Sequence, residues 1–197
     1  RPHMFVMSWV YEMPWGKGRP IPLSGFADWV AGGWRVNGIY SAYSGTPFTV
    51  SASTASLNAP GSSQTADLKA PIQFIGDVGR GTQWLAVTSF GDPNFGRTPG
   101  TFRFGTMGRN ALRGPGFQKA DLAIFKDFRV TERFVVQFKA ESFNFTNTPR
   151  FNGPSANVSN MVFNPDGSVR SINDFMAITS AFADSERKFR FGVRLSF

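Results

Sequence analysis

The sequence Phe189-Arg190-Phe191-Gly192-Val193-Arg194-Leu195-Ser196-Phe197 alternates strictly between apolar residues and residues that are polar or glycine. Successive side chains of a β-strand point to opposite faces, so this stretch predicts a strand with one apolar and one cationic face. The apolar face consists of Phe189, Phe191, Val193, Leu195 and Phe197, and the cationic residues on the other face are Lys188, Arg190 and Arg194. A strand with such a face must be covered on that side, either by a protein core or by lipid.

The composition of the chain helps to decide whether a protein core or lipid covers the apolar face. The 197 residues include 22 Phe, 5 Trp and 3 Tyr, and only 17% are charged, against about 25% in an average soluble domain. No stretch reaches the ~18 uninterrupted apolar residues that a membrane-spanning helix needs. If the chain crosses a membrane, we therefore expect it to cross as strands.

The same composition argues against most enzyme chemistry. The chain has no cysteine, which excludes disulfides, thiolate metal sites and cysteine nucleophiles. Its one histidine, His3, argues against zinc hydrolase and Ser-His-Asp chemistry. We expect no catalytic residue, no metal site and no cofactor, and we do not expect an enzyme.

The net charge of +8 suits either nucleic acid or anionic lipid headgroups. The basic residues are spread singly along the chain, and their longest cluster is Arg187-Lys188. We therefore expect no nucleic-acid partner. The sequence opens in an alternating pattern without the features of a signal peptide, so we expect residue 1 to lie inside a longer protein.

Four further segments show strand periodicity or strand composition. They are His3–Met13, Gly32–Ser44, Phe117–Phe128 and Arg133–Phe145. In the last of these the apolar phase slips to Phe143 and Phe145, which predicts a bulge or a change of environment. The connections are modest at 14–31, long at 46–116, tight at 129–132 and long again at 146–186, where Asn164-Pro165-Asp166-Gly167 predicts a turn rather than a calcium site.

The predicted fold class is all-β, an antiparallel meander of about five long strands with two long extracellular loops. Strands of about ten residues and alternating short and long connections are typical of outer-membrane barrels, whose periplasmic turns are short. Unpaired backbone groups are not tolerated in lipid, so we expect more strands before residue 1 to close the barrel. The residues expected to line its lumen are Lys188, Arg190, Arg194, Gln137, Lys139 and Glu141. The alternative is a secreted or surface β-sandwich adhesin whose apolar face packs on a second sheet.

Several runs of residues are similar to one known family. The chain resembles the C-terminal barrel of Oar-like TonB-dependent receptors at Trp34–Ile39, Ser44–Val50, Gly108–Phe117, Asp121–Phe128, Thr131–Arg133, Gln137–Glu141, Phe143–Asn147 and Phe191–Phe197. The resemblance implies that residues 1–197 are an incomplete piece, the last part, of a 22-stranded barrel with a plugged lumen. It also implies that the plug, an N-terminal carboxypeptidase-regulatory-like sandwich domain and a signal peptide lie outside this sequence.

The resemblance further implies a location in the bacterial outer membrane and transport of a bulky substrate, which it does not identify. The expected partners are outer-membrane lipid and lipopolysaccharide, the TonB complex through the plug, and the barrel-assembly machinery. In this family the terminal aromatic strand, here Phe189 to Phe197, resembles the signal that the assembly machinery recognises.

Overall fold

The computed structural model describes residues 3–55, 57 and 64–197, which form two compact units. The sheet unit comprises residues 3–43, 117–150 and 183–197. The loop unit comprises the described residues of 44–116 and 151–182. The long strands and the long connections predicted from the sequence thus fall into different units.

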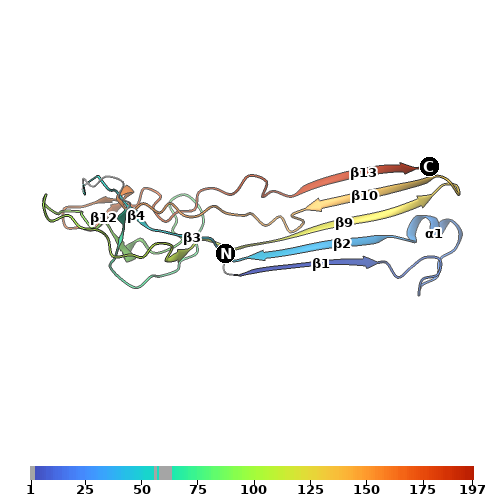
Figure 1. The fold of residues 1–197 in the computed structure, drawn as a ribbon, viewed down its shortest axis with the longest axis horizontal. Coiled ribbons are helices and arrows are strands. Elements are labelled where there is room, and N and C mark those ends of the chain that lie inside the picture. Colours follow the sequence, from blue (N-terminus) through green and yellow to red (C-terminus); the bar gives the residue numbers. More distant parts are fainter. Residues whose placement is uncertain (1–2, 56, 58–63) are drawn as a thin grey trace. The chain divides into compact units, whose positions relative to one another are not determined.

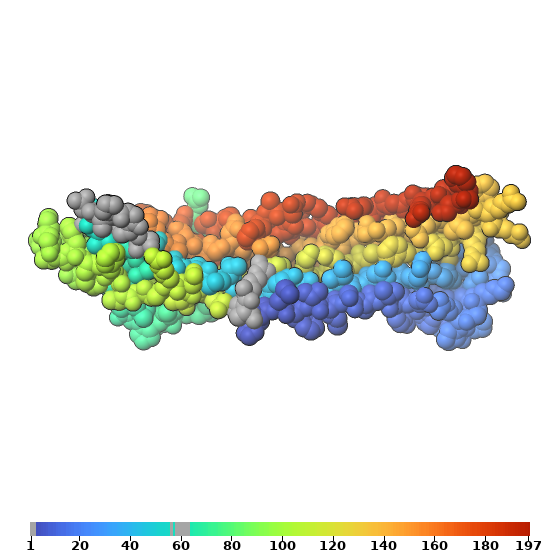
Figure 2. Space-filling model, viewed as in Figure 1, coloured from blue at the N-terminus to red at the C-terminus, as the bar shows by residue number. Residues whose placement is uncertain are grey.

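The sheet unit contains one five-stranded antiparallel sheet in the order β1-β2-β9-β10-β13 (Figure 1). Its strands are β1 (Met4–Glu12), β2 (Arg35–Tyr43), β9 (Phe117–Arg129), β10 (Val135–Phe143) and β13 (Lys188–Ser196). Figure 2 shows these strands as adjacent bands that run from blue to red. The spatial order follows the chain order, so the predicted all-β meander is confirmed.

The predicted bulge near the end of β10 is wrong. The pairing of β10 with β13 continues without a shift from Val135 opposite Ser196 to Phe143 opposite Lys188. The strand then ends, because Asn144 adopts a φ of 50° and its N–H donates to Asp121 Oδ1 at 2.8 Å. The change in apolar phase therefore marks the end of the strand rather than an extra residue within it.

The turn between β9 and β10 lies one residue later than predicted. Strand β9 continues to Arg129, and residues 130–134 form the turn. It is closed by the Val130 N–H, which donates to the Phe134 carbonyl at 3.0 Å. This connection is short, as expected.

The connection between β1 and β2 contains helix α1 (Gly25–Ala31), which the sequence analysis did not predict. Gly25 enters the helix with a φ of 58°, a conformation that favours glycine. The Gly32 N–H donates to the Asp28 carbonyl at 2.8 Å and closes the last turn. In the part of the chain that the structure describes, no helix has the length and apolar character needed to cross a membrane.

The loop unit is built from short elements. They are β3 (Pro47–Phe48), β4 (Ser51–Ala52), β5 (Gln64–Thr65), β6 (Asp67–Leu68), η1 (Val87–Ser89), β7 (Phe90–Gly91), β8 (Leu112–Arg113), η2 (Val158–Asn160), β11 (Val162–Phe163) and β12 (Val169–Ser171). They pair as β3-β8, β4-β5, β6-β7 and β11-β12. The two long connections are therefore folded, although no period in the sequence predicted regular structure there.

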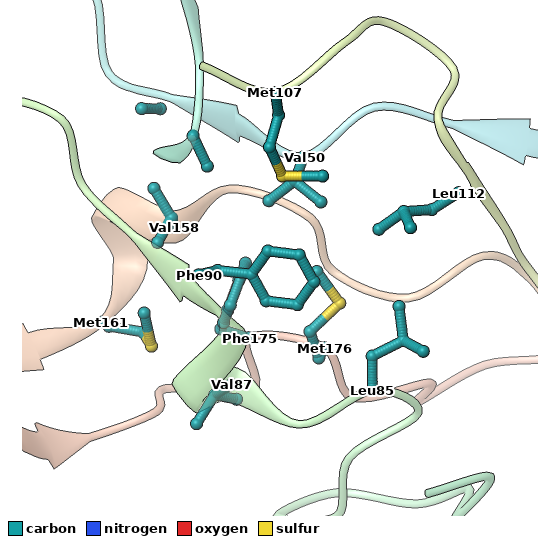
Figure 3. Close-up of a cluster of buried hydrophobic side chains, with 12 residues drawn as sticks. Val50, Leu85, Val87, Phe90, Met107, Leu112, Val158, Met161, Phe175 and Met176 are labelled. Atoms are coloured by element: carbon teal, nitrogen blue, oxygen red, sulfur yellow. The ribbon is translucent and has the colours of Figure 1, made fainter. Parts of the chain in front are cut away.

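A buried apolar cluster holds the loop unit together (Figure 3). The Phe90 and Phe175 rings meet edge to face, with centroids 5.8 Å apart, and Val50 and Val158 are fully buried beside them. Val50 and Phe90 come from the first long connection, whereas Val158 and Phe175 come from the second. Because both segments supply the core, neither can fold fully without the other.

The predicted turn at 164–167 is confirmed. The Gly167 N–H donates to the Asn164 carbonyl at 2.9 Å, and Gly167 has a φ of 83°. The Asp166 carboxylate accepts hydrogen bonds from the backbone and hydroxyl of Ser168, at 2.9 and 2.6 Å. The carboxylate thus has a local role in shaping the turn.

Candidate functional site

The strand register of the sheet unit sorts its side chains onto two faces. Residues directly opposite each other in neighbouring strands share a face, and the register is continuous across all four strand pairs. One face is mainly apolar and carries Phe5, Met7, Trp9, Tyr11, Val36, Gly38, Tyr40, Ala42, Gln118, Ala120, Leu122, Ile124, Lys126, Phe128, Val136, Phe138, Ala140, Ser142, Phe189, Phe191, Val193 and Leu195. The other face carries nearly all of the charged strand residues. These are called the apolar face and the polar face below.

The apolar residues predicted for the terminal strand lie together on the apolar face. Phe191 is opposite Ala140, and Val193 is opposite Phe138. These side chains are largely exposed, with 69% of Phe191 and 73% of Val193 accessible. Phe197 lies just beyond the end of β13 and is 93% exposed, with its ring centroid 6.4 Å from that of Phe134. A large exposed apolar surface marks contact with a membrane or a partner.

The six residues predicted to line a lumen share the polar face. Gln137 is opposite Arg194, and Glu141 is opposite Arg190. The Glu141 carboxylate lies 2.6 Å from Lys139 Nζ and 3.9 Å from Arg190 Nη1. The single carboxylate of β10 and β13 on this face thus lies between a cation of its own strand and a cation of the neighbouring strand. The structure places Lys188 there as well, opposite Phe143.

The polar face continues through residues that the sequence analysis did not single out. Asp127 of β9 accepts hydrogen bonds from Arg35 Nη2 and Gln137 Nε2, each at 2.8 Å. Nearer the start of β9, Lys119 Nζ lies 2.8 Å from Asp121 Oδ2. The alternation of side chains in β9 puts both aspartates on one face. Aligning β9 with β10 in the sequence would have shown that this is the face of Gln137 and Glu141.

Aromatic rings also contribute to the polar face. Lys139 Nζ lies 5.4 Å from the centroid of Phe125, and the Arg190 guanidinium lies 5.2 Å from that of Phe143. These distances fit cation–π contacts, which hold the charged groups close to the sheet. The polar face is less polar in β1, where it includes Val6 and Val10. The separation of polar from apolar side chains is therefore clearest in β10 and β13.

A shallow hollow of about 220 Å³ interrupts the polar face. Asn37, Ala123 and Glu141 are among its lining residues and lie side by side on β2, β9 and β10. Because the alanine side chain is small, the floor is low between the longer side chains. Ile39, Phe125 and Phe143 also line the hollow, so its surface is mainly apolar, and its polar groups come from Asn37, Asp121 and Glu141.

Both edges of the sheet are open in the described residues. Strands β1 and β13 each pair on one side only. Each edge therefore presents unpaired N–H and C=O groups that a further strand would satisfy. In hydrocarbon such groups cannot remain unpaired, because no water is present to bind them.

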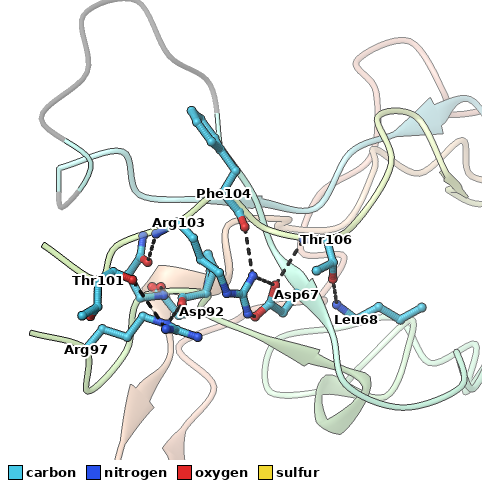
Figure 4. A network of polar contacts seen from close by, with 10 residues as sticks. Asp67, Leu68, Asp92, Arg97, Thr101, Arg103, Phe104 and Thr106 are labelled. Atoms are coloured by element: carbon cyan, nitrogen blue, oxygen red, sulfur yellow. Dashed lines mark hydrogen bonds and ion pairs between the residues drawn. The ribbon is translucent and has the colours of Figure 1, made fainter.

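The loop unit contains a polar network around Asp67 (Figure 4). The Asp67 carboxylate accepts two hydrogen bonds from Arg103, at 2.9 and 2.5 Å, and one from the Thr106 N–H at 3.1 Å. Burial of the carboxylate opposes its ionisation. The Arg103 guanidinium and the Thr106 donors outweigh this effect and hold the pKa of Asp67 below its usual value. This bidentate pair ties β6 to the segment before β8.

A second set of polar contacts joins the two long connections. Asp92 Oδ2 accepts a hydrogen bond of 2.6 Å from the Ser159 hydroxyl, while within the first connection Asn94 Oδ1 accepts one of 2.9 Å from the Arg103 N–H. The Ser53 N–H donates to Ser159 Oγ at 2.8 Å. In the described residues no three His, Cys, Asp or Glu side chains come together as a metal site would require.

Comparison with known proteins identifies a domain family. The family model described as an outer membrane beta barrel domain matches residues 1–190. The searches of curated proteins and of solved structures found no match. The matched region contains β1, β2, β9 and β10 in full, the first residues of β13, and both long connections.

Proposed function

Because the chain belongs to the outer membrane β-barrel domain family, we propose that it forms part of the wall of a TonB-dependent transporter. The family places the protein in the bacterial outer membrane. In the proposal, the apolar face of the sheet contacts lipid and the polar face lines the lumen. The two long connections lie at the outer surface, where they first meet a bulky substrate.

The observation that carries the proposal is the sorting of side chains across the sheet. Phe191 and Val193 are exposed on one face, while Lys139, Glu141 and Arg190 interact on the other. A barrel wall needs this combination, since lipid covers the outside and water fills the inside. The open edges of β1 and β13 fit the same interpretation, because a barrel closes through further strand pairs.

The direction of the strands supports the assignment of the loop unit to the outer surface. The strand ends that join the long connections, Tyr43 with Phe117 and Phe143 with Lys188, are paired at one end of the sheet. The five-residue turn at 130–134 lies at the other end. Long connections of outer-membrane barrels are extracellular and short ones are periplasmic.

The sequence resemblance to Oar-like receptors supports transport driven by TonB over passive diffusion. A secreted β-sandwich adhesin, the competing function, would cover the apolar face with a second sheet. In the described residues, the sheets other than the five-stranded one have two strands each. The structure therefore favours the barrel wall over the sandwich.

Two cysteine variants test the wall, because the chain contains no cysteine of its own. We expect Glu141→Cys to react with a charged, water-soluble thiosulfonate in outer-membrane vesicles, since it faces water. Val193→Cys is the matched control on the adjacent strand, and we expect it to be protected. Equal labelling at both positions would contradict the barrel wall.

A genetic comparison tests the energy source. Cells that lack the gene should lose uptake of a subset of the solutes whose uptake is lost in cells that lack TonB. If the solutes whose uptake is lost with the gene still enter cells that lack TonB, the protein is a passive pore and the transporter assignment fails.

A further inference from the structure

Helix α1 lies beside the apolar face of the sheet, at the end that carries the short turn. The Trp29 ring contacts Phe128, with centroids 5.2 Å apart, and its indole N–H donates to the Arg129 carbonyl at 3.4 Å. Phe128 is opposite Val136, which places it on the apolar face. The helix is thus attached to the last residues of β9.

Two more tryptophans fix the helix in this place. Trp34 Nε1 donates to the Val30 carbonyl at 3.0 Å, and Trp15 Nε1 donates to the Ala31 carbonyl at 2.7 Å. The Trp34 ring meets Phe128 and Phe138 edge to face, at 6.5 and 6.2 Å. These contacts satisfy carbonyls at the end of the helix, which would otherwise be unpaired.

The apolar face contains one charged side chain, Lys126, which the segment around α1 covers. It is opposite Phe138, in phase with the apolar residues, yet only 2% of it is exposed. Its ammonium group donates to the Gly32 carbonyl just after α1 and lies 5.0 Å from the Phe128 ring centroid and 5.8 Å from that of Trp34. The only lysine on this face is therefore enclosed by the segment that contains α1.

The outward side of this segment is strongly apolar. Phe26 is 76% exposed and stacks on Trp29, which is itself partly exposed, as are Val30 and Ile21. In a protein surrounded by water such exposed apolar side chains are unfavourable, and the stacked rings of Phe26 and Trp29 form an apolar patch. The patch continues the apolar face of the sheet past the end of β9, because Trp29 contacts Phe128.

We propose that α1 is an interfacial anchor whose Phe26 and Trp29 insert among the phospholipids of the periplasmic leaflet. Lipid covers the patch formed by Phe26 and Trp29, because this patch is continuous with the apolar face that is assigned to lipid. Aromatic side chains are enriched at the level of the headgroups, where the rings are buried and the indole N–H groups find polar partners. The anchor holds the end of β9 at the depth of the interface and shields Lys126 from the acyl chains. The inference relies on the proposed function for the lipid-facing assignment.

The absence of cysteine from the chain allows a direct test. Phe26→Cys is labelled with an environment-sensitive fluorophore in the protein reconstituted into phosphatidylethanolamine–phosphatidylglycerol vesicles. Phe26 is exposed and its one ring contact is with Trp29, so the variant should fold. We expect strong quenching by lipids that carry a spin label near the headgroup, and weaker quenching by lipids labelled near the chain end.

Two controls separate the possible failures. Val193→Cys on the apolar face should be quenched by lipid, and Gln137→Cys on the polar face should not. If Val193→Cys is quenched while Phe26→Cys responds only to aqueous iodide, the anchor is wrong and the barrel wall stands. If neither position is quenched by lipid, the proposed function itself fails. Crosslinking of two Phe26→Cys chains without lipid quenching would assign the patch to a second copy and overturn the anchor.

Discussion

The indole ring of Trp9 lies over Gly38, the residue directly opposite it in the pair of β1 and β2. A Cβ atom added to Gly38 would overlap the six-membered ring of Trp9. The ring thus covers a position in β2 that has no side chain of its own. Such aromatic cover is a known way to stabilise glycine within a sheet. Gly38 is therefore required by packing, since its backbone has an ordinary strand conformation.

Replacing Gly38 by valine should destabilise the sheet by about 1–3 kcal/mol, because Trp9 must leave its position to admit the side chain. Urea unfolding of the reconstituted protein, followed by tryptophan fluorescence, measures the loss. Gly192→Val is the matched control, since a Cβ at Gly192 in β13 would meet no described atom within 4 Å. Equal effects of the two changes would show that Trp9 does not constrain Gly38.

Arginine substitutions along β13 should reveal the depth of each residue in the membrane. Val193 lies near the middle of the strand, and Leu195 lies one residue from its end. We expect Val193→Arg to cost about 2–4 kcal/mol and Leu195→Arg about 0–1 kcal/mol, because a charge near the interface reaches water. The free energy of unfolding in vesicles measures both. Two variants as stable as the unmodified protein would contradict a lipid-facing strand.

The sequence predicted the sheet well, because strand periodicity is a local property. The alternation from Lys188 to Phe197 fixed the faces of β13, and the structure pairs it with β10 so that Arg190 meets Glu141. The same logic was less decisive at Phe143, where the change of phase predicted either a bulge or a change of environment, and the register continues without a bulge to the end of β10. Periodicity alone cannot distinguish a bulge from the end of a strand, since both interrupt the alternation.

The loop unit and α1 could not be predicted in the same way. Val50 and Phe175 meet in one core although 124 residues separate them in the sequence (175 − 50 − 1), and no repeating pattern links them. Helix α1 has seven residues, too few to display a helical period. Lys126 interrupts an apolar pattern, and only the Gly32 carbonyl and the surrounding rings explain its place.

The ion pair of Asp67 and Arg103 should stabilise the loop unit. Asp67→Asn removes the charge but keeps the shape, and we expect it to cost about 1–3 kcal/mol because the carboxylate is mostly buried. Hydrogen exchange of the loop-unit amides at neutral pH measures the loss. Asp77→Asn, at an exposed position in the same connection, is the control and should leave exchange unchanged.

The contribution of Asp67 should also depend on pH. Its pKa is lower in the folded state than its usual value, so the contribution is fully present above about pH 4 and is lost as the pH falls through the folded pKa. The difference in thermal stability between the unmodified protein and Asp67→Asn should therefore shrink in acid. A difference that stays constant from neutral pH down to strongly acidic solution would exclude this role.

The enclosure of Lys126 should appear as an energetic coupling with Trp34. Trp34→Ala removes one ring from beside the ammonium, which lies 5.8 Å from the ring centroid. In a Lys126→Met background the same change should cost less, by about 0.5–2 kcal/mol, because no charge is left to shield. A double-mutant cycle of unfolding free energies in vesicles measures the coupling. Additive effects would mean that Trp34 only fills space.

Removal of Phe197 should impair assembly of the barrel in the membrane. Its side chain is 93% exposed, and its ring lies 6.4 Å from that of Phe134, so the folded sheet loses little packing when Phe197 is deleted. We therefore expect a fall in the fraction that reaches the heat-modifiable, membrane-inserted form in cells, with little change in the unfolding of protein that has inserted. Phe134→Ala is the control, because it breaks the same ring contact and leaves the terminal phenylalanine in place. If Phe134→Ala lowers the inserted fraction as much as the deletion does, the ring contact matters and the terminal residue carries no assembly signal.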